Sequence, residues 1–154
     1  MSSLKETIQA DLNSAMRSKD AITTSTLRMV LSAVTNEEVA GKEARKLSDA
    51  DIITVLNREA KKRKEAILAY TEAKRPELAA SEELELTVIK KYLPEELSEA
   101  ELKAIIETAV ASANESGQSG PSAMGAVMKL VQPQVAGRAD GGLVANLVKQ
   151  LLSD

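Results

Sequence analysis

Cysteine, histidine, phenylalanine and tryptophan are all absent from the sequence. Without cysteine there is no disulfide or thiolate chemistry, and without cysteine and histidine the usual ligands of zinc are missing. Ser-His-Asp and Cys-His active sites are excluded, because no imidazole is available to act as the base. These residue types predict no self-contained hydrolytic or redox active site, no metal site and no cofactor.

Aromatic side chains and long apolar runs are scarce as well. Tyr70 and Tyr92 are the only aromatic residues, so the stacking platforms that most single-strand binders use are lacking. No segment reaches the roughly 20 apolar residues that a membrane span needs. Because no apolar run follows a basic stretch near the N-terminus, we expect no signal peptide. The sequence predicts a soluble, cytoplasmic protein without a membrane partner.

The net charge of −3 is divided unevenly along the chain. Up to Leu93 there are 16 Lys and Arg residues against 15 Asp and Glu residues, or +1, and from Pro94 onward there are 4 against 8, or −4. The sequence-independent part of nucleic-acid affinity comes from neutralising phosphates. An acidic C-terminal part therefore argues against indiscriminate binding, and any contact with RNA has to use a local patch.

Apolar residues recur at helical spacing almost throughout, and no stretch alternates with a period of two, which predicts an all-α fold. We expect four helices in an N-terminal lobe, residues 1–93. The third opens with a capping-box pattern at Ser48-x-x-Asp51, and the fourth starts at Pro76, where a missing N–H costs nothing. The fourth should run to Leu93, because Pro94 disfavours a helical conformation at the residue before it.

A smaller C-terminal lobe, residues 94–154, should hold three helices. The first opens with the capping box Ser98-x-x-Glu101. The second is expected from Pro121 to Val131, with Pro133 closing it, and the last follows Gly141. At about 60 residues this lobe is near the lower limit for independent stability.

Charged residues interrupt several apolar stripes. Glu82 and Glu85 occupy the middle of the face that the fourth helix should bury, Glu38 continues the stripe of the second helix, and Arg63 lies on the inner side of the third. Arg28 sits at a stripe margin. Because buried charge is costly unless paired, we expect Arg28 and Arg63 to contact carboxylates among these three.

Two interpretations of that cluster are open. The functional one is an acid/base pair or a carboxylate metal site. Di-iron sites in helix bundles, however, normally use Glu-x-x-His, and the chain has no histidine. The structural one is an interhelical ion network, which we favour because structural ion pairs perturb titration as readily as active sites do.

Three further segments have a structural and a functional interpretation. The basic run from Arg58 to Lys64 spreads around its helix, which favours a solvated face over an RNA-binding one. Gly125, inside a short helix, costs about 1 kcal/mol of stability relative to Ala. Its presence needs a reason, which is either close helix packing or backbone left exposed for a ligand. The turn 137–141 is a helix connector, although Arg138 with Lys129 and Lys149 would form a small basic edge.

Several segments together form a recognisable pattern along the chain. They are Asp11–Arg17, Thr26–Met29 with Asn36–Glu38, Arg63–Glu65 with Tyr70, Arg75–Ala79, Glu82 and Glu85 before Tyr92–Pro94, Met124–Lys129 and Gly137–Gly141. No one segment is decisive, but their order and spacing together are specific. Through these segments the chain resembles the GatB/YqeY family over essentially its full length. At Pro76 the chain departs from the acidic residue expected after Arg75.

This resemblance implies the four-helix and three-helix lobes and a link to transfer RNA. The related domain forms the tail of the GatB subunit of tRNA-dependent amidotransferases and is appended to some glutaminyl-tRNA synthetases, where it binds tRNA away from the chemistry. The match leaves out the catalytic domains of those enzymes. Carried over to this chain, the contact segments would be Met124–Lys129 and Gly137–Gly141. The charge pattern adds Lys149, so the predicted tRNA-binding residues are Gly125, Lys129, Gly137, Arg138 and Lys149.

Three functional hypotheses follow. The leading one is a non-catalytic, tRNA-associated accessory module linked to tRNA-dependent amidation or aminoacylation. The second is a module that docks to a translation enzyme, such as an aminoacyl-tRNA synthetase or an amidotransferase subunit. The third is an amidotransferase subunit, a glutamine-dependent carbon–nitrogen ligase, that uses Glu82 or Glu85.

Overall fold

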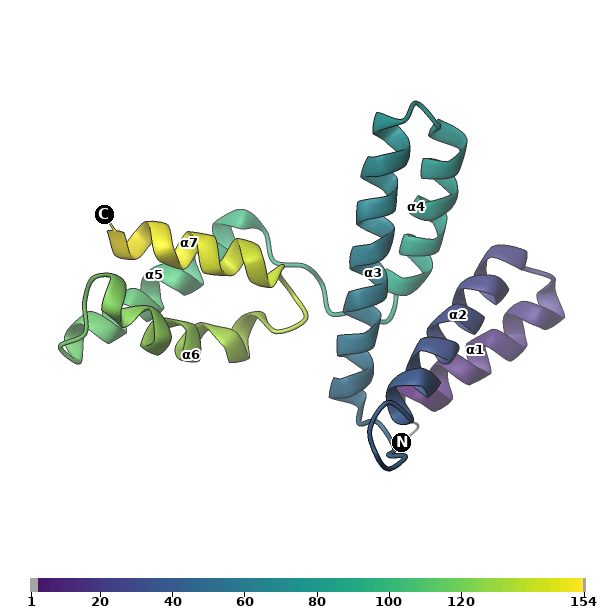
Figure 1. The fold of residues 1–154 in the computed structure, drawn as a ribbon, viewed down its shortest axis with the longest axis horizontal. Coiled ribbons are helices and arrows are strands. Elements are labelled where there is room, and N and C mark those ends of the chain that lie inside the picture. Colours follow the sequence, from purple (N-terminus) through teal and green to yellow (C-terminus); the bar gives the residue numbers. More distant parts are fainter. Residues whose placement is uncertain (1–2, 154) are drawn as a thin grey trace. The chain divides into compact units, whose positions relative to one another are not determined.

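The computed structural model describes residues 3–153, and every regular element in that range is helical (Figure 1). The all-α class predicted from the hydrophobic periodicity is confirmed. The elements are α1 (Leu4–Ser18), α2 (Ala21–Glu38), α3 (Asp49–Glu72), α4 (Pro76–Lys90), α5 (Glu99–Glu115), the 3₁₀ turn η1 (Pro121–Ala123), α6 (Met124–Val135) and α7 (Gly141–Ser153).

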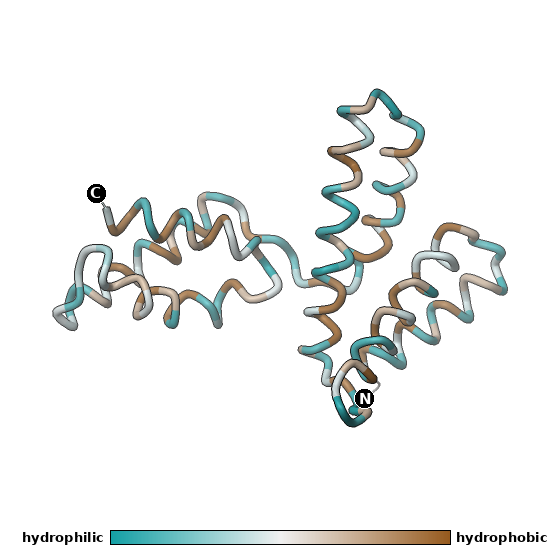
Figure 2. The backbone as a smooth tube through the Cα atoms, in the orientation of Figure 1, coloured by the Kyte–Doolittle hydropathy of each residue, from teal (hydrophilic) through white to brown (hydrophobic). Residues whose placement is uncertain are grey.

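The chain divides into two compact units, of which the first ends at Leu93 and the second begins at Pro94. Each unit has a hydrophobic core of its own. Figure 2 shows hydrophobic segments on the helix sides that face one another within each unit, with hydrophilic segments outside. Each helix therefore buries its apolar face against other helices of the same unit.

The N-terminal unit consists of two helical hairpins (Figure 1). The chain turns between α1 and α2 at Lys19 and between α3 and α4 at Lys74, and both residues have a left-handed φ of 59°. Helix α2 packs against both α3 and α4. The core is apolar, and its largest fully buried side chains are Ile8, Leu27, Ile52, Leu56, Ile89, Val30 and Val34.

In the C-terminal unit α5, α6 and α7 pack against one another around a second core. Buried residues recur at a spacing of four on α6 and α7, which aligns them on one side of each helix. The largest fully buried side chains are Leu102, Ile106, Val127, Val131, Val144 and Val148.

Capping boxes fix the starts of three helices. At Ser48 and Ser98 the side chain accepts a hydrogen bond from the backbone N–H three residues on, and the side chain of Asp51 or Glu101 accepts one in return. The same arrangement joins Ser3 and Glu6 at α1. Each box satisfies N–H groups that have no partner inside the helix.

Two helix ends differ from the prediction. Helix α4 ends at Lys90, because Tyr92 and Leu93 donate to carbonyls three residues back, at 3.1 and 3.2 Å, in a tighter turn. Helix α6 continues through Pro133 to Val135. Pro133 is exposed in the last turn, so its ring lies on the solvent side and only one hydrogen bond is lost.

None of the helices in residues 3–153 combines the length and the apolar character needed to cross a membrane.

Candidate nucleic-acid interface

All three lysines of the C-terminal unit are exposed, and none of them takes part in an ion pair among residues 3–153. Two of them, Lys129 on α6 and Lys149 on α7, are the lysines predicted from the sequence to contact tRNA. Lys129 is two positions from the buried Val127 and Val131, which places it about 200° around the helix from the core. Both ammonium groups can therefore bind an anion without first breaking an ion pair.

The backbone around Gly125 is open. Gly125 is exposed at the second position of α6, and a Cβ built there would meet no other atom within 4 Å. Close helix packing, one of the two explanations that the sequence allowed, is therefore not the reason for glycine at this position. The open backbone leaves room for a ligand to approach one turn before Lys129.

Replacing Gly125 with alanine tests this explanation. Because the added Cβ meets nothing and alanine is the better helix former, we expect Gly125→Ala to stabilise the C-terminal unit by about 0.5–1 kcal/mol. Urea unfolding measured by circular dichroism gives the change in stability. A destabilised variant would show that the glycine is needed for packing after all.

Arg138 has a structural role in addition to its charge. Its Nε donates to the carbonyl of Glu95 at 3.1 Å, and its own carbonyl accepts from the backbone N–H of Leu97 at 2.9 Å. Gly137, before it, has a left-handed φ of 75° that suits glycine. Arg138 therefore ties the segment before α5 to the connection between α6 and α7, and it is half-buried there.

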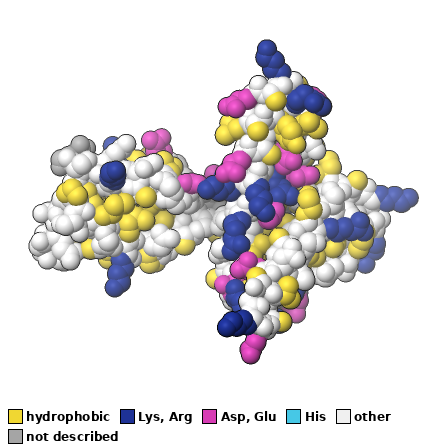
Figure 3. Space-filling model, in the orientation of Figure 1, with side chains coloured by type: hydrophobic (Ala, Val, Ile, Leu, Met, Phe, Trp, Pro, Cys, Tyr) yellow, Lys and Arg dark blue, Asp and Glu magenta, His cyan; other side chains and the backbone are white. Residues whose placement is uncertain are grey.

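The two units differ in how their charges are distributed over the face shown in Figure 3. On the N-terminal unit several Lys and Arg side chains lie beside Asp and Glu side chains in the middle of this face, and others stand alone at its edges. On the C-terminal unit the cations stand singly among apolar and uncharged atoms. A polyanion would therefore meet separate point charges on this face of the C-terminal unit.

In the N-terminal unit, an ion cluster surrounds the buried guanidinium of Arg63. The residue is 7% exposed. Its NH1 lies 2.6 Å from Glu59 Oε2, its Nε lies 3.4 Å from Glu85 Oε2, and its NH2 contacts the sulfur of Met29 at 3.5 Å. Sequence reasoning missed Glu59, although its spacing of four residues before Arg63 is the favourable one for a helical ion pair.

Arg28 and Glu38 do not belong to this cluster, so the prediction was wrong for both residues. Arg28 is exposed, and its NH2 contacts the sulfur of Met16 at 3.3 Å instead of a carboxylate. It lies one residue past the buried Leu27, which is enough to turn its side chain out to solvent. Glu38 pairs with Lys5 at 2.7 Å, which joins the end of α2 to the start of α1.

Glu82, half-buried on α4, completes the cluster electrostatically. Burial raises the pKa of its carboxyl, the negative charge of Glu85 raises it further, and Arg63 opposes both. Glu82 is therefore protonated more readily in the folded state than in the unfolded chain.

This raised pKa predicts a pH-dependent effect of Glu82→Gln. When folding raises the pKa of a carboxyl, its protonated form fits the folded state better than its charged form does. The stability that the protonated form contributes is present at low pH and is lost as the pH rises through the folded pKa. We therefore expect Glu82→Gln to raise the urea midpoint at pH 7 and to have no effect below the ordinary glutamate pKa of about 4.3. The exposed neighbour Glu83→Gln is the control. An equal gain at both pH values would contradict the assignment.

The Arg63 cluster has the chemistry of an internally paired network. Among residues 3–153 there is no group of three or more carboxylates placed to hold a metal ion. One groove beside the cluster, between α2 and α3, includes Glu59, but neither Glu82 nor Glu85 lines it. Arg63 pairs with two of the carboxylates and neutralises part of their charge. We therefore interpret the cluster as a structural network that fixes how α3 and α4 align, and not as a site of proton transfer.

Two all-helical units, one with a buried ion cluster and one with isolated exposed lysines, define a small helical protein. The chain belongs to the Yqey-like protein family, whose model matches residues 5–152.

Curated fungal proteins are similar to the chain. An uncharacterized protein of Schizosaccharomyces pombe is 34% identical over 96 residues, which are 62% of this chain and 76% of that protein. Altered inheritance of mitochondria protein 41 of Pyrenophora tritici-repentis is 28% identical over 149 residues, 94% of this chain and 78% of the relative. The Saccharomyces cerevisiae protein of that name is 36% identical over 88 residues, 56% of this chain and 46% of the relative.

Proposed function

We propose that this protein is a non-catalytic accessory module that associates with tRNA through its C-terminal unit. Lys129 and Lys149 contact phosphates, and the open backbone at Gly125 lets the RNA approach. Such contacts position an RNA but do not read its sequence. The module acts beside an enzyme of tRNA-dependent amidation or aminoacylation, in the cytoplasm, whereas the relatives from Pyrenophora tritici-repentis and Saccharomyces cerevisiae are named as mitochondrial proteins.

One observation carries the proposal. The C-terminal unit is acidic overall, at −4, and yet Lys129 and Lys149 remain exposed and outside the ion pairs of residues 3–153. In an acidic unit, nearby carboxylates would be expected to pair with both lysines. The choice of tRNA over other polyanions rests on the resemblance to the tail domain of GatB.

The alternative of an amidotransferase subunit has less support. It requires Glu82 or Glu85 to act as a base in an open pocket. Glu85 lies 3.4 Å from the Arg63 guanidinium, and neither Glu82 nor Glu85 lines the groove beside the cluster. We therefore place catalysis in a partner enzyme.

Recovery of the chain from cell extract tests the proposal against protein docking. The tagged full-length chain is purified with and without RNase, and the bound RNA is sequenced. We expect tRNA to be enriched, and its enrichment to be lost for a variant carrying Lys129→Glu and Lys149→Glu. A preparation that contains a stoichiometric protein partner but no tRNA would overturn the proposal.

A further inference from the structure

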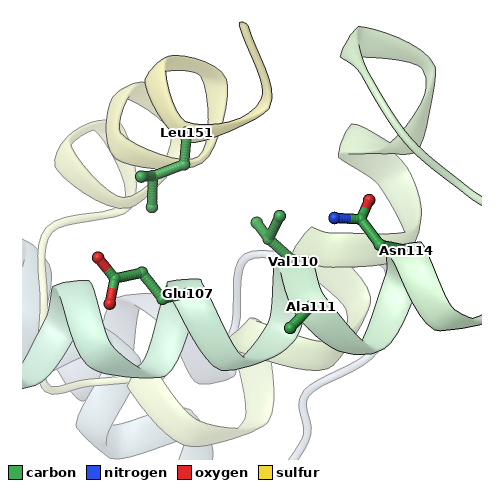
Figure 4. A pocket seen from close by; sticks show the side chains of 5 residues that line it. All are labelled: Glu107, Val110, Ala111, Asn114 and Leu151. Carbon is green, nitrogen blue, oxygen red and sulfur yellow. The ribbon is translucent and has the colours of Figure 1, made fainter. Parts of the chain in front are cut away.

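A shallow groove crosses the C-terminal unit between α5 and α7. Its lining consists of Glu107, Val110, Ala111 and Asn114 from α5 and Leu151 from α7. Figure 4 shows Leu151 reaching from α7 toward α5, with Glu107 and Val110 pointing into the same space from the other side. The groove shares no residue with the proposed tRNA contacts.

The middle of the groove is apolar and incompletely covered. Val110 and Leu151 pack against the core but stay half-buried, and Ala111 is exposed. These three side chains retain apolar surface that a partner could remove from water. They supply the contact area but do not select the partner.

The charge of the groove selects the partner. The Glu107 carboxylate is exposed and takes part in no ion pair among residues 3–153, and none of the five lining residues is a cation. The whole unit carries −4. Its field attracts a cationic partner and repels nucleic acid at this face.

The spacing of the polar ends fits a helix. Glu107 and Asn114 are seven residues apart on α5, which is about two helical turns or roughly 10 Å along its axis. An amphipathic helix presents apolar side chains over the same length at positions i, i+3 or i+4, and i+7. A carboxylate at one end and an amide at the other can then bind polar groups that flank that stripe.

We propose that this groove docks a cationic amphipathic helix of a protein partner. Apolar side chains of that helix pack on Val110, Ala111 and Leu151, and a Lys or Arg pairs with Glu107. Lys149 is two positions from Leu151 and so lies about 200° around α7 from it. The groove and the RNA-contacting lysine thus occupy different sides of α7, and the proposal stands independently of tRNA binding.

A model peptide tests the inference directly. The probe is a helical Leu/Lys peptide of about four turns (~14 residues), with leucines at helical spacing, and a scrambled peptide of the same composition is its control. Both are titrated into the ¹⁵N-labelled full-length chain. We expect the helical peptide to shift the amide resonances of Val110, Ala111, Asn114 and Leu151 most, and the scrambled one to shift them little.

Two variants separate charge from shape. Glu107→Lys removes the ion pair, and Ala111→Gln fills the groove without changing the charge. We expect each to weaken peptide binding about tenfold, which corresponds to about 1.4 kcal/mol. Glu99→Lys, the same charge change on an exposed residue of α5 outside the groove, should weaken binding less than twofold.

Three results would overturn the proposal. The first is equal binding of the helical and scrambled peptides. The second is a set of shifted resonances that lies outside α5 and α7. The third is concentration-dependent shifting of the groove resonances in the chain without peptide, because a second copy of the chain would then be the occupant.

Discussion

Arg63→Ala is expected to destabilise the N-terminal unit by about 3–5 kcal/mol, because it leaves carboxylates without their buried counter-charge. In the wild-type protein the guanidinium lies 2.6 Å from Glu59 and 3.4 Å from Glu85. The variant also loses the packing of the arginine stem inside the bundle. The free energy of unfolding, from urea titrations followed by circular dichroism, measures the loss.

Arg28 provides a matched control on the same unit. It is an arginine too, but it is exposed, and among residues 3–153 its guanidinium donates to the sulfur of Met16 and takes part in no ion pair. We expect Arg28→Ala to change stability by no more than about 0.5 kcal/mol. Similar effects of the two substitutions would contradict the assignment of Arg63 as the centre of the cluster.

A rescue experiment distinguishes lost charge pairing from lost shape. In a triple variant, Arg63→Met is combined with Glu59→Gln and Glu85→Gln, which removes the charges together and keeps most of the volume. Because replacing a whole buried ion group with neutral residues is often close to neutral, we expect this variant to regain most of the stability that Arg63→Ala loses. Arg63→Met alone is the control, because it keeps most of the volume but leaves Glu59 and Glu85 without their counter-charge. A triple variant no more stable than Arg63→Met would mean that unpaired carboxylates are not the cause of the loss.

Reversing both exposed lysines of the C-terminal unit should have the largest effect on function. We expect the variant with Lys129→Glu and Lys149→Glu to lose about tenfold or more in tRNA affinity at low salt, because each reversal replaces attraction to phosphate with repulsion. The dependence of log affinity on log salt concentration should become shallower by about two, one for each lysine. Fluorescence anisotropy with labelled tRNA measures both quantities.

Lys103→Glu is the control for this charge reversal. Lys103 is an exposed lysine of the same unit, but it lies on α5 and outside the proposed contact surface. Its reversal should leave the affinity within about twofold once the change in net charge is screened by salt. A loss as large as that of the double variant would indicate attraction by overall charge without a specific surface.

The sequence predicted local structure better than it predicted side-chain partners. Capping boxes at Ser48 and Ser98 depend on residues three positions apart, so the sequence shows them directly. The extension of α6 past Pro133 was missed, because a proline in the last, exposed turn costs little and its exposure depends on tertiary packing.

The candidate sites show the same limit. Helical spacing correctly marked Arg63 as facing inward, but it could not say whether Glu38, Glu59 or Glu85 would reach the guanidinium across the bundle. Arg28 was assigned to the cluster from its neighbour Leu27, although one residue turns a helix by about 100°. The backbone role of Arg138 at the Glu95 carbonyl depends on a contact 43 positions away, which no local pattern contains.

Binding of unfractionated tRNA to the wild-type chain at two salt concentrations tests the central claim most directly. We expect clear binding at low salt that weakens steeply at the higher concentration, because phosphate contacts release counterions. Binding that is absent at low salt, or that does not change with salt, would contradict a tRNA contact made by exposed lysines on the C-terminal unit.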